Sequence, residues 1–384
     1  MKRKNLTLVF NHFEQEHLGK DVFLVPYYLG KQLGYDITIV YKSTETNKNF
    51  PEEINGVKLI PLQVIEDNRI PFYKQNVNSF KYIASKARQI DMLMCFHHDL
   101  LTELRVCLYK LFNPWGKVYV KLDLGELVAR QEYSKKRQKW FWNKLMYTFL
   151  KKVDILSCET TEIYNQLKES IYPHYQYNDK LILMPNGFDE DLLKTFQVKE
   201  KRFEEKENLF ITVGRLGTPQ KNTEMILEAL TKLEMNDWKF YFIGPVEESL
   251  KKIINEFYDQ NPDKKHSVKF IGSVYDKKDL WEYYNRAKVF VFTSRWESYG
   301  LVLNEANRFR NYILSTPVGA YYDITDNEKY GRSLKQEDSN YLAQQMQQII
   351  NGNLNIDVYD DFIPKEISWE YQIQKLSAKI RNIL

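Results

Sequence analysis

Short apolar runs alternate with longer amphipathic stretches along the whole chain, and this alternation constrains the fold more than any other feature. Apolar runs of about five residues between polar segments are typical of buried strands, and the longer stretches between several of them suit helices. Strands separated by helices favour parallel sheets with helices on both faces. The predicted strands are Leu6–Phe10, Ile37–Val40, Val57–Pro61, Met92–Phe96, Val118–Leu122, Ile155–Ser157, Leu181–Met184, Leu209–Val213, Phe240–Ile243, Val268–Ile271, Val289–Phe292 and Ile313–Ser315.

A polar, charged run over residues 190–208 separates the first seven predicted strands from the last five. It follows Pro185–Asp189, whose Asn-Gly pair is a tight-turn signal. A chain of 384 residues suggests two domains of ordinary size. We therefore predict an α/β fold with two Rossmann-like domains whose parallel sheets face each other across a cleft. The expected divisions are an N-terminal domain at 1–189, a linker at 190–208, a C-terminal domain at 209–365 and a terminal helix at 366–384.

Composition limits the class of protein and its compartment. The net charge of +4 is mild and does not call for a nucleic-acid partner. Cys95, Cys107 and Cys158 form no Cys-x-x-Cys motif, which fits a reducing cytosol. The first apolar run ends after five residues, so it is read as a strand and not as an export signal. No run approaches the roughly 20 apolar residues needed to span a bilayer. We expect a soluble, cytoplasmic protein.

The stretch Thr293–Ala306 combines a strand end, a polar turn and a helix that Gly300 opens. A helix N-terminus following a strand forms an anion site, because unpaired N–H groups and the helix dipole point to one place. Glu297 lies just before this helix and Glu305 lies about one turn into it. A nucleotide sugar, which carries both phosphates and hydroxyls, suits this layout. The alternative is a plain strand-to-helix joint with two solvated glutamates.

A second stretch, Leu209–Asn222, runs from a buried strand through a glycine-bearing loop to a helix at Thr223–Leu233. Arg215 and Lys221 lie on this loop. Two cations on such a loop can hold a diphosphate, because arginine offers a bidentate fork and lysine a point charge. The alternative is that both are ordinary surface cations in a lysine-rich chain.

The two stretches, in this order, resemble the motifs of retaining glycosyltransferases of family 4, which have the GT-B fold. Glu297 and Glu305 match the family's Glu-x7-Glu motif, and Val213–Leu216 with Lys221 matches its diphosphate loop. The resemblance implies that Arg215 and Lys221 hold the donor diphosphate, Glu297 the sugar hydroxyls and Glu305 the ribose. It also implies a terminal helix that crosses back to the N-terminal domain. Backbone groups implied in donor binding belong to Gly272 and Val274 beside the base and to Ser298, Tyr299, Gly300 and Leu301 beside the phosphates.

The N-terminal half matches the family less closely. Gly19 follows the first strand in the loop that the resemblance places near the donor phosphate, and it is the one glycine left of the usual pair. Asp123 stands at the strand end where the family has a catalytic histidine, with Lys121 two residues before it. An ionised aspartate can accept a hydrogen bond or stabilise positive charge at the sugar carbon. The alternative is an aspartate that caps a turn.

Two other patterns invite a metal or membrane reading. His97 and His98 are adjacent, so on an extended chain they point in opposite directions, and Asp189–Asp191 lies in a turn; we expect no metal site. The segment 130–152 interleaves lysines with aromatic residues. It reads as a crossover helix, and it also suits the anionic inner face of a membrane that presents a lipid-linked acceptor.

The sequence thus predicts a retaining glycosyltransferase that moves a sugar from a nucleotide-diphosphate sugar to a hydroxyl of a glycan or lipid-linked sugar. It needs no cofactor beyond its donor, and a UDP-sugar is favoured slightly over a GDP-sugar. The family resemblance implies a role in the assembly of a cell-surface polysaccharide or glycolipid. One alternative is a catalytically silent partner subunit that stabilises an active glycosyltransferase. A less favoured one is a sugar-nucleotide epimerase on the same fold.

Overall fold

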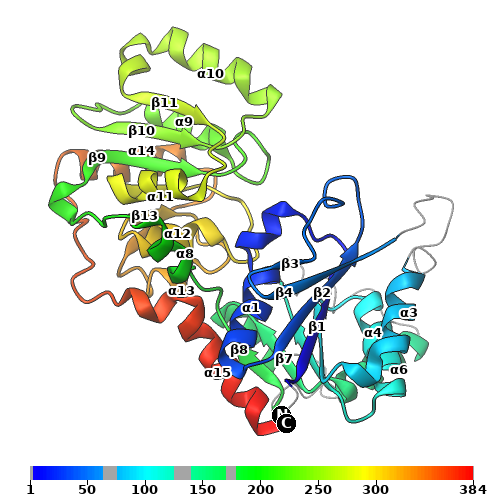
Figure 1. Ribbon diagram of the computed structural model, residues 1–384. Helices are drawn as coiled ribbons and strands as arrows, with labels where there is room; N and C mark the ends of the chain where they lie inside the picture. The colour runs from blue at the N-terminus through cyan, green and yellow to red at the C-terminus, as the bar shows by residue number, and fades with distance from the viewer. Residues whose placement is uncertain (1–2, 64–75, 125–139, 170–178, 384) are drawn as a thin grey trace. The chain divides into compact units, whose positions relative to one another are not determined.

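The structure is a computed structural model that describes residues 3–63, 76–124, 140–169 and 179–383. It divides into two compact units, each with its own sheet (Figure 1). Unit 1 comprises Met1–Gly187 and Ser368–Leu384, and unit 2 comprises Phe188–Ile367. The predicted α/β class with two parallel-sheet domains is confirmed.

Within the described part of unit 1, the strands form one sheet in the order β3-β4-β2-β1-β5-β6-β7-β8. Neighbouring strands run parallel except for the short pair β3 and β4. The strands are β1 (Asn5–Val9), β2 (Asp36–Lys42), β3 (Glu53–Ile54), β4 (Val57–Leu62), β5 (Met92–Phe96), β6 (Lys117–Lys121), β7 (Ile155–Cys158) and β8 (Leu181–Leu183). The helices are η1 (Gln15–Gly19), α1 (Asp21–Leu33), α3 (Val77–Lys86), η2 (Ala87–Gln89), α4 (Leu100–Phe112), α6 (Trp140–Lys152), α7 (Thr161–Lys168) and α15 (Trp369–Ile383).

The uninterrupted apolar run of β5 reflects burial on both faces of the sheet. Met92 and Met94 pack in the cluster that contains residues of α1 and α15. The intervening Leu93 and Cys95 pack in the opposite cluster, with residues of α3, α4 and α6. Alternate side chains of a strand point to opposite faces, so a strand with helices on both sides must be apolar throughout.

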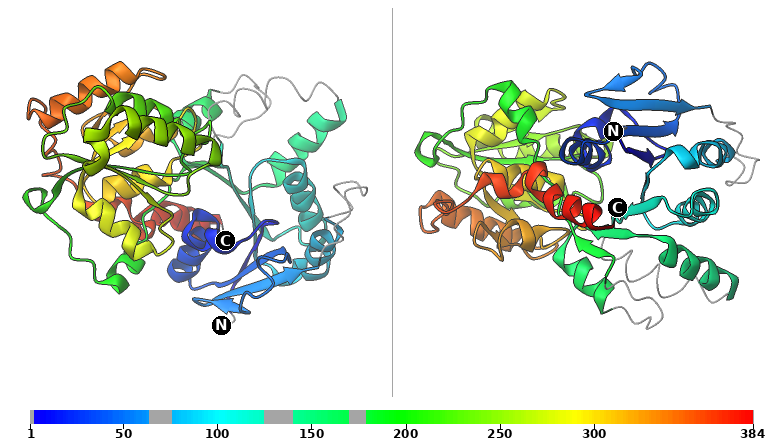
Figure 2. Two further views of the ribbon diagram at one scale, coloured as in Figure 1. Left: turned by 90° about the horizontal axis from the view of Figure 1, so that it is seen from above. Right: turned by 60° about the horizontal axis from the view of Figure 1, so that its bottom comes forward.

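Helix α15 comes from the C-terminal end of the chain but packs in unit 1 beside α1 (Figures 1 and 2). Trp369, at the start of α15, is 1% exposed and belongs to the same apolar cluster as α1. Gly187 lies so close to it that an added Cβ would stand 2.4 Å from the Trp369 nitrogen. Glycine is therefore required where the chain leaves unit 1.

Within unit 2, parallel strands form a second sheet in the order β11-β10-β9-β12-β13-β14. The strands are β9 (Glu207–Val213), β10 (Lys239–Ile243), β11 (Val268–Gly272), β12 (Ala287–Phe292), β13 (Tyr312–Ser315) and β14 (Gly331–Ser333). The helices are α8 (Glu190–Phe196), η3 (Phe203–Glu205), α9 (Thr223–Leu230), α10 (Glu248–Gln260), η4 (Pro262–His266), α11 (Lys277–Arg286), α12 (Leu301–Arg308), α13 (Tyr321–Ile324), α14 (Ser339–Ile350) and η5 (Pro364–Ile367).

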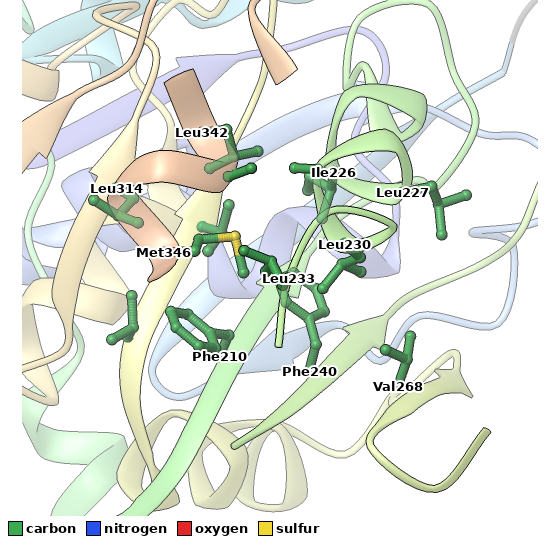
Figure 3. Packing of buried hydrophobic residues seen from close by; sticks show 14 of the residues in the cluster. Phe210, Ile226, Leu227, Leu230, Leu233, Phe240, Val268, Leu314, Leu342 and Met346 are labelled. Atoms are coloured by element: carbon green, nitrogen blue, oxygen red, sulfur yellow. The ribbon is translucent and has the colours of Figure 1, made fainter. Parts of the chain in front are cut away.

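Helices cover both faces of the unit 2 sheet. On one face, Ile226 of α9 and Met346 of α14 belong to the same apolar cluster as Phe210 of β9 (Figure 3). On the other face, residues of α11, α12 and α13 cover Phe290 of β12. The two helix layers hold the sheet in place, and the sheet in turn sets where the loops at its carboxyl edge begin.

The predicted linker, residues 190–208, is part of unit 2 and forms α8, η3 and the start of β9. Leu193 is buried in the cluster that contains α11 and α12. Arg308 forms ion pairs with Glu190 and with Glu200, the latter at 2.8 Å between Nη2 and Oε1. Glu190 and Glu200 of this polar run therefore form ion pairs with Arg308 of unit 2. The division between the units lies at Gly187–Phe188.

Candidate functional site

Two loops of unit 2 meet at the carboxyl edge of its sheet, where β9 and β12 are neighbours. After β9 the next strand, β10, is added toward one end of the sheet, and after β12 the next strand, β13, is added toward the other end. Ligands of open parallel sheets bind where the strand order reverses in this way. The loops are residues 214–222 and 293–300. Thr293 Oγ1 donates to the main-chain oxygens of Lys221 and Asn222, each at 3.0 Å. The two sequence motifs are thereby brought side by side.

Lys221 and Glu297 form an ion pair at the centre of this edge, with 2.5 Å between Nζ and Oε1. Their side chains are only 16% and 12% exposed, so water screens the pair poorly. The ammonium lies 4.8 Å from the ring centroid of Phe292. An added Cβ on Gly214 would stand 3.3 Å from Lys221 Cε, so this glycine gives the lysine stem its path.

Glu305 of α12 lies close by and is 8% exposed. Its Oε1 accepts hydrogen bonds from Lys277 Nζ and, at 3.3 Å, from Trp281 Nε1. Burial first, and then the negative charge of Glu305, raise the pKa of the Tyr284 hydroxyl. The sequence predicted Glu305 but not Lys277, because Lys277 and Lys278 look alike at the start of an amphipathic helix.

The helix start beside Glu297 is held in an unusual backbone conformation. Gly300 precedes α12 with φ at +88°, a left-handed value that glycine adopts without strain. Tyr299 is buried, and an added Cβ on Gly319 would stand 2.5 Å from its main-chain oxygen. The loop after β13 therefore supports the segment that contains Ser298 and Leu301, whose N–H groups were predicted to meet phosphate.

The remaining predicted donor residues lie on the same unit. Arg215 is exposed, and its Nη2 donates to Gln220 Oε1 at 3.2 Å. Among the described residues it pairs with no carboxylate, so its charge is available to an anion. Gly272 ends β11 with φ at +84°, and Val274 packs partly against the cluster under α11. Contact of these two residues with a base stays a prediction.

In unit 1, a buried lysine gathers carboxylates at the carboxyl ends of β6 and β7. Lys121 is fully buried, and its Nζ contacts Glu159 Oε1 and, at 2.6 Å, Asp21 Oδ2. Asn186 Nδ2 donates to the same Glu159 oxygen at 2.9 Å. Asp123 is two residues beyond β6, and its Oδ1 is buried without a hydrogen-bond partner within the described residues. Asp123 thus lies beside a charged cluster at the edge where a ligand could accept or donate hydrogen bonds.

The charges of this cluster act on one another strongly. Burial lowers the pKa of Lys121, but Asp21 and Glu159 outweigh that effect and keep the ammonium charged. Burial raises the pKa of Glu159 and the charge of Asp123 raises it further, against the attraction of Lys121. The sequence suggested Lys121 and Asp123 but missed Asp21 and Glu159, which lie 100 residues before and 38 residues after the lysine.

Gly19, His97 and His98, which the sequence analysis singled out, also lie in unit 1. Gly19 ends η1, and an added Cβ there would meet nothing within 4 Å, so packing does not require glycine. The His98 side chain is 6% exposed and contacts Glu103 at 3.0 Å, whereas His97 has φ at +62°. Within the described residues no group of three or more His, Cys, Asp or Glu side chains could hold a metal ion.

The segment 130–152 is described only from residue 140, so its lysines at 135–139 lie outside the described residues. In α6, Met146 and Phe149 are buried in unit 1, which is the behaviour of a crossover helix. Tyr147 is 43% exposed, and Lys151 Nζ lies 4.3 Å from its ring centroid. No described helix is both long and apolar enough to cross a bilayer.

Comparison with solved structures decides the fold. Sucrose-phosphate synthase from Thermosynechococcus elongatus superposes with a TM-score of 0.69 over 99% of both chains, at 16% identity. The chain has the GT-B fold. HepE (Alr3699) from Anabaena, solved in complex with UDP and glucose, superposes with a TM-score of 0.66 over 99% of this chain and 100% of HepE, at 11% identity. At these identities the likeness of the GT-B chains establishes architecture alone.

Sequence comparisons match part of the chain. Residues 194–368, which cover most of unit 2, match the family model "Glycosyl transferases group 1". A probable sucrose-phosphate synthase from Thermosipho melanesiensis is 28% identical over 182 residues, 43% of this chain and 41% of its own length. The amylovoran biosynthesis glycosyltransferase AmsD from Erwinia amylovora is 32% identical over 112 residues, 29% of each chain. The GT-B chain thus matches less than half the length of either relative.

Proposed function

We propose that the protein is a retaining glycosyltransferase that transfers a sugar from a nucleotide-diphosphate sugar to a hydroxyl acceptor. The observation that carries the proposal is the partly buried Lys221–Glu297 pair at the point where the unit 2 sheet reverses its strand order. Lys277 of α11 and Glu305 of α12 form a second ion pair in the same unit. A cation for phosphate and carboxylates for hydroxyls are the groups that a nucleotide sugar needs.

The geometry suggests how a donor would use this site. A diphosphate would draw Lys221 away from Glu297, because it offers more charge and more acceptor oxygens. Glu297 would then be free to accept hydrogen bonds from sugar hydroxyls, and Arg215 would supply a second cation to the diphosphate. Both cations would stabilise the nucleoside diphosphate as it leaves. Retention of configuration, the hexosyl nature of the donor and the family 4 assignment rest on the motif resemblance.

The donor and acceptor classes are also proposals. We favour a UDP-sugar, since HepE, a structure of the same fold, contains UDP. A glycan or lipid-linked acceptor in polysaccharide assembly fits the similarity to AmsD, a glycosyltransferase of amylovoran biosynthesis. Asp123 of unit 1 would accept the hydrogen bond of an acceptor hydroxyl. We propose a cytoplasmic protein that associates with the inner face of the membrane through residues 130–152.

A thermal-shift panel with UDP, GDP, ADP and their sugars tests the proposal, followed by donor-hydrolysis assays on any sugar that binds. We expect stabilisation by one nucleoside diphosphate and slow release of that diphosphate from its sugar. Glu297→Ala should reduce release by orders of magnitude without loss of the folded state. If none of the nucleotides binds, the protein is better described as a silent partner subunit. If Glu297→Ala retains full turnover, Glu297 is not in the site.

A further inference from the structure

Lys277 is in contact with Glu305, the carboxylate to which the motif resemblance assigns the ribose, yet no motif assigns Lys277 a role. It is the first residue of α11, and its Nζ bonds to Glu305 Oε1. Its side chain is 37% exposed, whereas that of Glu305 is 11% exposed. A long side chain that reaches from the surface to a buried carboxylate gives up conformational freedom, so the contact is a specific one.

The position of Lys277 is fixed by the start of its helix. The Asp276 side chain caps α11 by accepting hydrogen bonds from the main-chain nitrogens of Lys278, at 2.7 Å, and Asp279, at 3.2 Å. The cap follows directly on the Gly272–Val274 turn, which we propose lies beside the base. Lys277 therefore connects the proposed base-binding turn to the proposed ribose carboxylate.

The two donors at Glu305 converge on one oxygen. Lys277 Nζ and Trp281 Nε1 both bond to Oε1. Neither of these two donors reaches Oε2, and the buried Tyr284 hydroxyl, which interacts with the same carboxylate, has no hydrogen-bond partner within the described residues. Oε2 is therefore the oxygen left for a ligand hydroxyl. Two donors on one oxygen also fix the rotation of the carboxylate, and a fixed acceptor binds a hydroxyl with less loss of entropy.

We propose that Lys277 is a positioning residue for the nucleoside: it holds Glu305 by Oε1 so that Oε2 meets a ribose hydroxyl. This inference rests on the proposed function. Lys277 then contributes to the preference for a ribonucleotide over a nucleotide without ribose hydroxyls. Its loss should weaken the ribonucleotide and leave the dideoxynucleotide nearly unchanged.

The test compares the Kd of the nucleoside diphosphate that binds best (UDP, GDP or ADP) with the Kd of its 2′,3′-dideoxy counterpart by isothermal titration calorimetry. The wild-type protein should prefer the ribonucleotide by about 10-fold or more, the usual worth of a hydrogen bond to a charged group. Glu305→Gln should remove most of this preference. Lys277→Met should reduce it by at least about 3-fold, and Lys277→Arg should retain part of it.

Lys278→Met is the matched control, since Lys278 is the exposed neighbour on the same helix and should leave the preference unchanged. If Lys277→Met weakens both nucleotides equally, keeps the wild-type preference or binds the ribonucleotide more tightly, the positioning role is wrong, while nucleotide binding still supports the proposed function. If the wild-type protein binds none of the three diphosphates, both the proposed function and this inference fall. A thermal-unfolding scan of each variant identifies any general loss of structure.

Discussion

Replacing Glu297 with glutamine is expected to strengthen the binding of a nucleoside diphosphate while stopping transfer. In the structure Glu297 holds Lys221 at 2.5 Å between Oε1 and Nζ, with both side chains at most 16% exposed. A diphosphate must break this pair before it can take the ammonium. It must also approach the carboxylate, whose like charge repels it. Glutamine removes the repulsion and weakens the hold on Lys221, but it no longer offers two acceptor oxygens to the sugar.

The size of the effect follows from the strength of the pair. A hydrogen bond to a charged group contributes about 1.5 to 3 kcal/mol, and part of that is recovered when the freed Glu297 is hydrated. The remaining gain of about 1 to 2 kcal/mol corresponds to a Kd about 5 to 30 times lower. Lys221→Met should act in the opposite direction, because it removes the cation itself.

Isothermal titration with the nucleoside diphosphate measures both variants, and release of that diphosphate from its sugar measures turnover. Glu248→Gln is the control, because Glu248 forms a comparable pair with Lys251 at 2.6 Å but is 86% exposed. An exposed pair contributes about 0 to 1 kcal/mol, so affinity and turnover should not change. Weaker diphosphate binding by Glu297→Gln would refute the partner exchange that the proposed mechanism requires.

Four further predictions concern the supporting structure, its pH dependence and the membrane. Lys121→Met should lower the free energy of unfolding by about 3 to 5 kcal/mol in urea titrations, because buried carboxylates lose their cation; an unchanged midpoint would contradict the burial of the cluster. Because the pKa of Glu159 is raised in the folded state, that state holds its proton more tightly, and stability should fall as pH rises above about 4.5. Glu159→Gln should flatten this dependence. Gly319→Ala should reduce both stability and donor turnover, since the added Cβ would stand 2.5 Å from the main-chain oxygen of Tyr299 in the loop proposed to bind the donor. Gly352→Ala, with a similar positive φ and open space, should cost only about 1 kcal/mol of stability. Vesicles with anionic lipid should retain the protein through residues 130–152 in flotation assays, and equal retention on neutral vesicles would count against that attachment.

The positions of most strands along the chain and of the two main loops could be predicted, because they depend on local patterns. Apolar runs of five residues in β5 and four in β12 mark these strands, because both of their faces are buried. The short edge strands β3 and β14 were missed, since two or three residues carry no periodic signal.

The partners of site residues were harder to predict than the residues themselves. Lys121 is fully buried, and a lysine is almost never fully buried unless it is paired with a carboxylate. Its partners could not be predicted, because they are distant from it in sequence. Residues 190–208 were predicted as a linker, and in the structure they belong to unit 2 and form α8, η3 and the start of β9. A polar run is typical of a linker, and the sequence does not show that Glu190 and Glu200 form ion pairs with Arg308, which lies on α12.

The most direct test of the central claim is whether Lys221 recognises the second phosphate of a nucleotide. Calorimetric titrations would compare UDP, GDP and ADP with their monophosphates, in the wild-type protein and in Lys221→Met. We predict that the wild-type protein binds one diphosphate about 10-fold or more tightly than its monophosphate, and that Lys221→Met removes most of this difference. Equal affinity for diphosphate and monophosphate in the wild-type protein, or an unchanged difference in Lys221→Met, would contradict the account.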